Sequence, residues 1–249
     1  MIHSINNYQL PNKIPILNDN TIRTACLDNK VGEIVYNGVN FEGFNGDSKF
    51  FGLQRNSDPK ATLNKVQKRM EIDYSTMPVF RKSRIAILLE SPHTNEYLPN
   101  NKTGISGPAM GSSGNRFNGQ CISVFNNNIG VLQAALGINT GSPQRFECEV
   151  FFVNAIQYQC SLGYSPIKKE IRDFVFEALW NSYPNSFRDD LVERFNILKP
   201  NLIINACTHE LQKTVCNNTS IAPYLSGFNY SFLTASKHIS AWDKNTIIL

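Results

Sequence analysis

The fold of this chain is decided by one stretch, Ser83-Arg84-Ile85-Ala86-Ile87-Leu88-Leu89-Glu90-Ser91-Pro92-His93-Thr94-Asn95-Glu96-Tyr97. From Ile85 to Glu90 the only polar side chain is the last one, a pattern typical of a parallel strand buried on both faces. Pro92 cannot donate a ladder hydrogen bond and favours an extended Ser91, so the chain is expected to leave the sheet at this point. Ligands of open α/β sheets bind at this carboxyl edge.

Three more buried runs follow, and helical patterns lie between them. The further strands are expected over 149–156, 200–206 and 230–235. The apolar spacing and stop signals predict helices over about 129–136, 165–181, 189–198 and 208–216. Strand and helix alternate four times, which predicts an α/β three-layer sandwich with a central four-stranded parallel sheet.

The chain is expected to divide into an N-terminal extension, residues 1–80, packed on a main domain, residues 81–249. Two segments around Asn37-Gly38 predict a hairpin over 32–44, because Asn-Gly suits a type I′ turn. Asp58-Pro59 and the apolar spacing after it predict an amphipathic helix over 59–73. A long Gly/Ser/Asn-rich stretch, 100–119, is expected to be a loop that forms part of a site.

Composition favours a soluble, cytoplasmic protein, which we expect to be a monomer. The 249 residues are 41% hydrophobic and 18% charged, which argues against disorder, and no apolar run reaches the roughly 20 residues that cross a bilayer. The first residues lack a secretory signal pattern. The six cysteines form no Cys-x-x-Cys pair, so neither a metal site nor an iron-sulfur cluster is expected. The net charge of +4 is compatible with a polyanionic partner.

Polar side chains end several of the expected strands. Glu90 and His93 follow the first strand, Asn154 and Gln157 the second, and His238 the fourth. Right-handed crossovers place the carboxyl ends of parallel strands at one edge, so these groups are expected in one pocket. The chain contains no nucleophile elbow, no phosphate-loop lysine and no Gly-x-Gly-x-x-Gly after a strand.

In their order along the chain, these residues resemble the motifs of the uracil-DNA glycosylase superfamily. Leu89-Glu90-Ser91-Pro92-His93 resembles its first motif, and Gly114-Asn115-Arg116-Phe117-Asn118-Gly119 the Gly-Arg-Pro-Phe-x-Gly segment of its thermophilic-type branch. Val153-Asn154-Ala155 is similar to the strand-end asparagine that reads the pyrimidine edge. Ala235-Ser236-Lys237-His238-Ile239-Ser240 resembles the last motif, His-Pro-Ser, and the resemblance covers residues 84–243. Ser91 stands where the main branch has a water-activating aspartate, and the cluster-binding cysteines of the thermophilic-type branch are absent.

The resemblance implies a uracil-DNA glycosylase-like catalytic domain that flips uracil or a modified pyrimidine out of DNA. It would hydrolyse the N-glycosidic bond and leave an abasic site, in repair or in defence against phage, without metal or other cofactor. Cleavage builds positive charge on the sugar and negative charge on the base, which a carboxylate and an imidazole donor suit. The roles implied are catalytic for Glu90, Ser91, His93 and His238; substrate-binding for Phe117, Asn154, Gln157 and Tyr158; and DNA-binding for Ser112, Ser113, Lys237, Ile239, Ser240 and Trp242.

Other interpretations of the same residues stay open. Glu90 can cap the following turn, Asn154 can bond backbone, His238 can be a surface histidine and Phe117 can be core. A solvated role is expected for Lys168, Lys169, Arg172 and Lys237, with phosphate contact as the alternative. Two rival functions remain: a nucleic-acid-binding module of the same fold without catalysis, and an N-glycosidase of free nucleosides or nucleotides.

Overall fold

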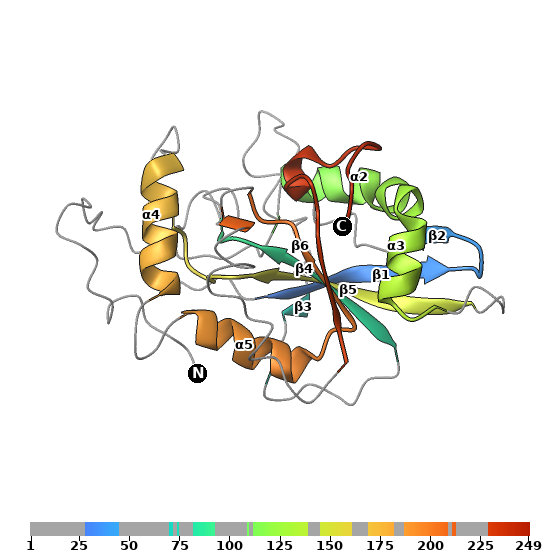
Figure 1. The fold of residues 1–249 in the computed structure, drawn as a ribbon, viewed down its shortest axis with the longest axis horizontal. Coiled ribbons are helices and arrows are strands. Elements are labelled where there is room, and N and C mark those ends of the chain that lie inside the picture. The colour runs from blue at the N-terminus through green and yellow to red at the C-terminus, as the bar shows by residue number, and fades with distance from the viewer. Residues whose placement is uncertain are drawn as a thin grey trace, which may run out of the picture.

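A seven-stranded sheet forms the centre of the molecule (Figure 1). The computed structural model describes residues 28–44, 70–71, 74, 82–92, 109, 112–138, 145–160, 169–181, 187–208, 211–212 and 229–249. The strand order is β2-β1-β5-β4-β6-β7, and β3 pairs with β1. The strands are β1 Asn29–Tyr36, β2 Phe41–Phe44, β3 Met70–Glu71, β4 Ser83–Leu89, β5 Phe146–Asn154, β6 Leu202–Asn205 and β7 Ser231–Thr234.

The four predicted strands are present and parallel. β4 lies between β5 and β6, and β7 pairs with the far side of β6. The prediction of a purely four-stranded parallel sheet is wrong, because β1 joins the free side of β5 in antiparallel register and carries β2 and β3 with it. The sheet is therefore mixed. The strands beyond β5 on that side, β1, β2 and β3, come from the first eighty residues, so this segment contributes strands to the sheet itself.

The predicted hairpin forms, with a different turn. Tyr36 pairs with Phe41, so the connection has four residues instead of two. Gly38 has a φ of 95°, whereas Asn37 does not adopt positive φ. The side chain of Asn37 instead accepts hydrogen bonds from the backbone N–H groups of Val39 and Asn40, at 3.0 and 2.9 Å. An asparagine side chain that mimics a backbone turn in this way replaces the type I′ geometry.

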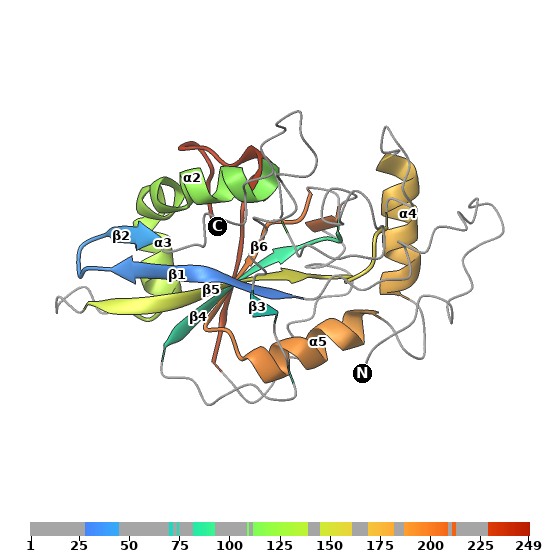
Figure 2. The ribbon, with the colours of Figure 1, turned by 180° about the vertical axis from the view of Figure 1, so that it is seen from behind.

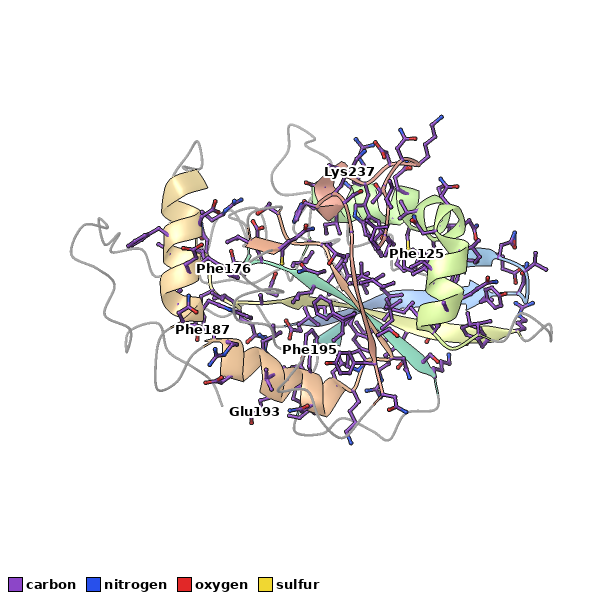
Figure 3. All side chains as sticks on the ribbon, viewed as in Figure 1. Phe125, Phe176, Phe187, Glu193, Phe195 and Lys237 are labelled. Atoms are coloured by element: carbon purple, nitrogen blue, oxygen red, sulfur yellow. The ribbon has the colours of Figure 1, made fainter. Side chains whose placement is uncertain are left out.

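Helices cover both faces of the sheet (Figure 2). One face carries α2 Ser112–Asn127, α3 Ile129–Ala135 and the 3₁₀ helix η7 Ile239–Ala241, and we call it the α2 face. The other face, called the α5 face, carries α5 Phe187–Leu198, and α4 Lys169–Trp180, whose buried side chains join the same core, stands beside the carboxyl ends of the strands (Figure 1). Figure 3 shows the labelled Phe125 and Phe195 on opposite sides of the sheet. Because β4 is buried on both sides, its side chains alternate between the two cores.

Two predictions about the connections fail. Residues 112–119 form the start of α2 and not a loop, because apolar side chains recur at helical spacing behind the glycines. These side chains are Phe117, Cys121, Val124 and Phe125, all fully buried. Most of the predicted helix 59–73 lies outside the described residues, and its last part, Met70–Glu71, is strand β3. The predicted end of α3 is confirmed, since Gly137 follows it with a φ of 65°.

The C-terminal residues protect the outer edge of β7. Thr234 donates its N–H to the carbonyl of Leu249 at 2.6 Å and accepts one in return at 2.9 Å. Ile248 forms an antiparallel bridge with Ala235. An edge strand is an aggregation hazard when its backbone groups are unpaired, and this segment pairs those of Thr234 at the end of β7. Within the described ranges, none of the helices has the length and apolar character needed to cross a membrane.

Candidate functional site

The candidate site lies at the carboxyl ends of the parallel strands, where the connections of β4 and β6 diverge. The chain leaves β4 through α2 and α3 on one face, and it enters β6 from α4 and α5 on the other. Because β4 and β6 are neighbours whose outgoing connections run toward opposite ends of the sheet, a topological switch point falls between them. Glu90 directly follows β4 at this position.

Glu90 is engaged in an ion pair across this point. One carboxylate oxygen, Oε1, accepts a hydrogen bond from Nη1 of Arg172 at 3.1 Å, and the other, Oε2, accepts from the backbone N–H of Thr208 at 2.9 Å. The same guanidinium contacts Asp173 and Thr208 Oγ1. Burial on its own would lower the pKa of Arg172, but the charges of Glu90 and Asp173 outweigh it and raise this pKa. Arg172 was expected to be solvated, and it instead joins α4 to the ends of β4 and β6.

Asn154 has a buried side chain whose two polar atoms are unpaired. It is fully excluded from solvent, and neither Oδ1 nor Nδ2 has a hydrogen-bond partner among the residues that the structure describes. Asn154 pairs with Leu89, which belongs to the core of the α2 face, so the carboxamide points to that face. Buried polar groups are nearly always hydrogen-bonded, and an exception calls for an explanation such as a ligand.

His238 lies on the same face as Asn154. It caps the N-terminus of η7, where its Nδ1 accepts the backbone N–H of Ser240 at 3.3 Å and lies 2.9 Å from Ser240 Oγ. A ring nitrogen that accepts a backbone hydrogen bond carries a lone pair, so the proton of the neutral imidazole is on Nε2. The geometry therefore makes Nε2 the donor nitrogen.

The structure brings the sequence-predicted residues to one edge but not to one face. Asn154 is the last residue of β5, Glu90 directly follows β4, and His238 lies four residues after β7. Glu90 comes one residue after Leu89 and turns to the α5 face, where Arg172 holds it, whereas Asn154 and His238 belong to the α2 face. A ligand that contacts all three must therefore span the rim of the sheet.

Ser91 and Tyr158 lie near a buried thiol. The hydroxyl of Ser91 is hydrogen-bonded to Cys160, whose pKa is raised to about 12 because burial outweighs that hydrogen bond. Tyr158 is buried and packs its ring edge-on against Phe187, with centroids 5.5 Å apart, which places it in the core. Gln157 is half-buried at the end of the same segment. His93 lies outside the described residues.

Three side chains predicted to contact substrate or DNA are core residues instead. Phe117, Ile239 and Trp242 are completely buried. The ring of Phe117 packs against Phe152 at 4.9 Å and Trp242 at 5.4 Å between centroids, and the indole N–H of Trp242 donates to the carbonyl of Lys237 at 3.0 Å. The prediction of an exposed stacking face and an exposed apolar wedge is therefore wrong for these residues, since α2 turns Phe117 inward and η7 packs Ile239 and Trp242 into the same core.

The remaining predicted DNA contacts are polar. Lys237 donates to both carboxylate oxygens of Asp243, at 2.9 and 2.7 Å, so its charge is neutralised within the chain (labelled in Figure 3). The hydrogen bond from Lys237 also lowers the pKa of Asp243. Ser240 is exposed and Ser113 half-buried. Ser112 begins α2, and its side chain lies outside the described ones.

Sequence reasoning missed the charged residues beneath the site. Arg194 and Asp190 are buried on α5, in phase with its apolar residues Phe187, Leu191 and Leu198. An Asp–Arg pair at i,i+4 on the inward stripe of a helix is a readable signal, because such a pair is normally solvated. Arg194 donates to the carbonyl oxygens of Asn154 and Ala155.

The described residues define a class of protein: an α/β protein with a mixed sheet and a polar carboxyl edge. In the comparisons with known proteins, no family model matches the chain, and neither a curated protein nor a solved structure matches it. The resemblance to the uracil-DNA glycosylase superfamily thus stays a prediction from the motifs. Within the described ranges, no group of three or more His, Cys, Asp or Glu side chains is placed to hold a metal ion.

Proposed function

We propose that this protein is a DNA glycosylase that hydrolyses the N-glycosidic bond of uracil or a modified pyrimidine flipped out of DNA. The observation that carries the proposal is the unpaired, fully buried carboxamide of Asn154 at the carboxyl edge of the sheet. A carboxamide offers one acceptor oxygen and a donor NH₂ side by side. The edge of uracil presents the complementary pair, an N–H donor beside a carbonyl acceptor, so a flipped base would satisfy both atoms.

His238 is the proposed electrophile. As the bond to the sugar breaks, negative charge develops on the carbonyl oxygens of the departing base. The Nε2–H that follows from the hydrogen bond at Nδ1 is a neutral donor that can stabilise this charge. Its position on the α2 face, the face of Asn154, supports contact of both residues with the same base.

Glu90 is the proposed stabiliser of the sugar cation. A carboxylate has about four lone-pair positions, and the bonds from Arg172 and Thr208 use two of them. The remaining positions can hold the attacking water, with Ser91 as the next residue at the rim. This arrangement supports a base bound on the α2 face with its sugar over the edge of the sheet.

DNA is the proposed partner. Extrusion of a base costs a few kcal/mol, which contacts with the strand must offset. Because Phe117, Ile239 and Trp242 lie in the core, these contacts are proposed to come from polar groups at the rim, such as the exposed hydroxyl of Ser240. The positive net charge of +4 favours approach to a polyanion.

One observation favours a second candidate function, a nucleic-acid-binding module without catalysis. Both oxygens of Glu90 already hold protein partners, and a serine follows it. In this alternative the carboxylate ties β4 to α4 and β6 and has no part in chemistry. In such a protein Asn154 would still bind a base, but no bond would break.

The deciding experiment incubates the full chain with DNA duplexes and single strands that each carry one uracil or modified pyrimidine, followed by alkaline scission. We expect an alkali-labile site at the altered base. Asn154→Ala, His238→Ala and Glu90→Gln should each lower the rate by about 10²-fold or more. Asn127→Ala removes an exposed asparagine of α2 and is the matched control, with a rate close to that of the wild type.

Three outcomes would contradict the proposal. Binding of DNA with no product from the folded protein would favour the binding module, especially if affinity falls steeply with salt. Release of bases from free nucleosides and not from DNA would show the alternative N-glycosidase. Equal rates for Asn154→Ala and the wild type would remove Asn154 from the site.

A further inference from the structure

A cluster of buried charges surrounds the backbone of Asn154. Asp28 is 0% and Arg194 5% exposed, and Asp190 and the hydroxyl of Tyr74 complete the group. Nη1 of Arg194 lies 2.6 Å from Oδ2 of Asp28, and Nε of Arg194 lies 2.9 Å from Oδ2 of Asp190. Tyr74 donates its hydroxyl proton to Oδ2 of Asp28 at 2.7 Å.

Two members of this cluster bind the Asn154 residue from opposite ends of its backbone. The N–H of Asn154 donates to Oδ1 of Asp28 at 3.1 Å, and the carbonyl oxygen of Asn154 accepts from Nη2 of Arg194 at 3.0 Å. Nη2 also donates to the carbonyl of Ala155 at 3.2 Å. Asp28 and Arg194 are themselves paired, so the N–H and the carbonyl of Asn154, the Asp28 carboxylate and the Arg194 guanidinium form a closed ring of hydrogen bonds. This ring fixes the backbone on both sides of the Asn154 Cα atom.

The position of this ring coincides with the end of strand pairing. β1 pairs with β5 only as far as Asn29 opposite Phe152, so its ladder stops short of Asn154. The carboxylate of Asp28, the residue just before β1, takes over the hydrogen bond that a longer strand would supply. On the other side, Ala155 and Ile156 donate to the carbonyls of Leu89 and Glu90 at 2.7 and 3.0 Å.

Pairing these backbone atoms with buried charged side chains costs desolvation free energy. A buried ion pair must overcome the desolvation of both charges, and apolar residues of similar volume often stabilise a fold equally well or better. Burial on its own would lower the pKa of Arg194, but the charges of Asp28 and Asp190 raise it, so the guanidinium keeps its charge. A planar guanidinium places several donors in fixed directions, which a single lysine nitrogen does not.

We propose that Arg194 and Asp28 are positioning residues that fix the direction of the Asn154 carboxamide. This inference rests on the proposed function of Asn154 as the group that recognises the base. It makes Asp28 and Tyr74, both from the first eighty residues, part of the recognition apparatus, although neither touches the base. The cluster acts through the backbone of Asn154, so its removal changes which base is accepted more than how fast an accepted base is released.

The test compares Arg194→Lys with Asp190→Asn in the full chain. The lysine variant keeps the charge but loses the bonds of Nη2 to the carbonyls of Asn154 and Ala155, whereas Asp190→Asn disturbs the same cluster and leaves these bonds intact. The first readout needs no activity: amide hydrogen exchange and the side-chain NH₂ resonances of Asn154 in protein labelled with ¹⁵N-asparagine. We expect exchange of the Asn154 amide to become at least tenfold faster in Arg194→Lys and to stay within twofold in Asp190→Asn.

The second readout is discrimination, the ratio of kcat/KM for the preferred base to that for its nearest competitor. We expect Arg194→Lys to lower this ratio at least tenfold and Asp190→Asn to leave it unchanged. In an Asn154→Ala background, Arg194→Lys should lower the ratio no further.

Equal amide exchange in the two variants would overturn the inference. So would an Arg194→Lys variant that is slower on every base but keeps the same ratio. A wild-type protein that releases no base would refute the proposed glycosylase instead, and the exchange measurement would still decide whether Arg194 fixes Asn154. If Arg194→Lys does not fold, Asp28→Ala tests the other half of the ring, because it removes the acceptor of the Asn154 N–H and the partner of Nη1 of Arg194.

Discussion

The carboxylate of Glu90 lies 3.1 Å from Nη1 of Arg172 and bridges from there to the backbone N–H of Thr208. This relationship joins three segments that are far apart in sequence: the end of β4, helix α4 and the turn after β6. Glu90 is 8% exposed, so its charge depends on these partners more than on water. The ion pair is therefore structural whether or not Glu90 also takes part in catalysis.

Replacement of Arg172 by glutamine should destabilise the protein. The change leaves a nearly buried carboxylate without its cation, and loss of a charge-assisted hydrogen bond of this kind costs about 2 kcal/mol. Urea denaturation of Arg172→Gln should show this loss. Arg145→Gln is the matched control, because Arg145 is 70% exposed in its pair with Glu42 and should change stability by less than about 0.5 kcal/mol. Equal stability of the two variants would show that water already screens Glu90.

Replacement of Phe117 by alanine separates a core role from a base-stacking role. The ring is fully buried among Phe44, Phe152 and Trp242, so its removal should cost about 3–5 kcal/mol of unfolding free energy. Phe174→Ala makes the same change on α4 at a ring that is 47% exposed, and it should cost less than about 0.5 kcal/mol. A Phe117→Ala protein that is as stable as the wild type but inactive on DNA would restore the stacking role.

The strands of the core were predictable because their physical signal is strong. A run such as Ile85–Leu89 is uniformly apolar, and only a strand covered on both faces buries it completely. The pairing of β1 with β5 was not predictable, because the alternating pattern of a hairpin identifies its inner face but not the strand beside which it lies. The sheet was therefore expected with too few strands.

The sequence predicts that the site residues lie at the same edge of the sheet, but not to which face of the sheet each side chain turns. Strand ends placed Glu90, Asn154 and His238 at one rim, as the topology rules require. Successive residues of a strand point to opposite faces, so the face of a side chain depends on the residue at which the strand stops. Leu89 pairs with Asn154 and faces the α2 side, whereas Glu90, one position later, turns to the α5 face. Phe117 was misplaced because the glycines around it conceal its helical spacing with Cys121, Val124 and Phe125.

Asn128 should hold the C-terminal residues against the sheet. Its buried side chain donates to the carbonyls of Val124 and Thr246 at 2.7 and 2.9 Å and accepts from the N–H of Ile248 at 2.8 Å. Asn128→Ala would leave these buried backbone groups unpaired, so we expect a loss of about 2–3 kcal/mol and faster amide exchange at Ile248.

The neighbouring Asn127 provides the control for this experiment. Its exposed side chain donates to the carbonyl of Lys244 at 2.6 Å, and water can replace that bond. Asn127→Ala should therefore cost less than about 1 kcal/mol. If both variants lose the same stability, or if Ile248 exchanges at the wild-type rate in Asn128→Ala, the C-terminal residues are held by their pairing with β7 alone.

The buried thiols should make the protein less stable at high pH. Burial raises the pKa of Cys148 to about 12, whereas an unfolded cysteine ionises near pH ~8.5. A group whose pKa is raised by folding contributes its full stabilisation below the unfolded value and loses it as the pH rises toward the folded value. For Cys148 this loss should reach about 2 kcal/mol at pH 10.

The measurement is the difference in unfolding free energy between pH 7 and pH 10 for the wild type and Cys148→Ala. The void left by the alanine cancels because it is present at both pH values, so the variant should lose about 2 kcal/mol less than the wild type on going to pH 10. Identical losses would mean that the Cys148 thiol ionises as readily in the folded protein as in the unfolded chain.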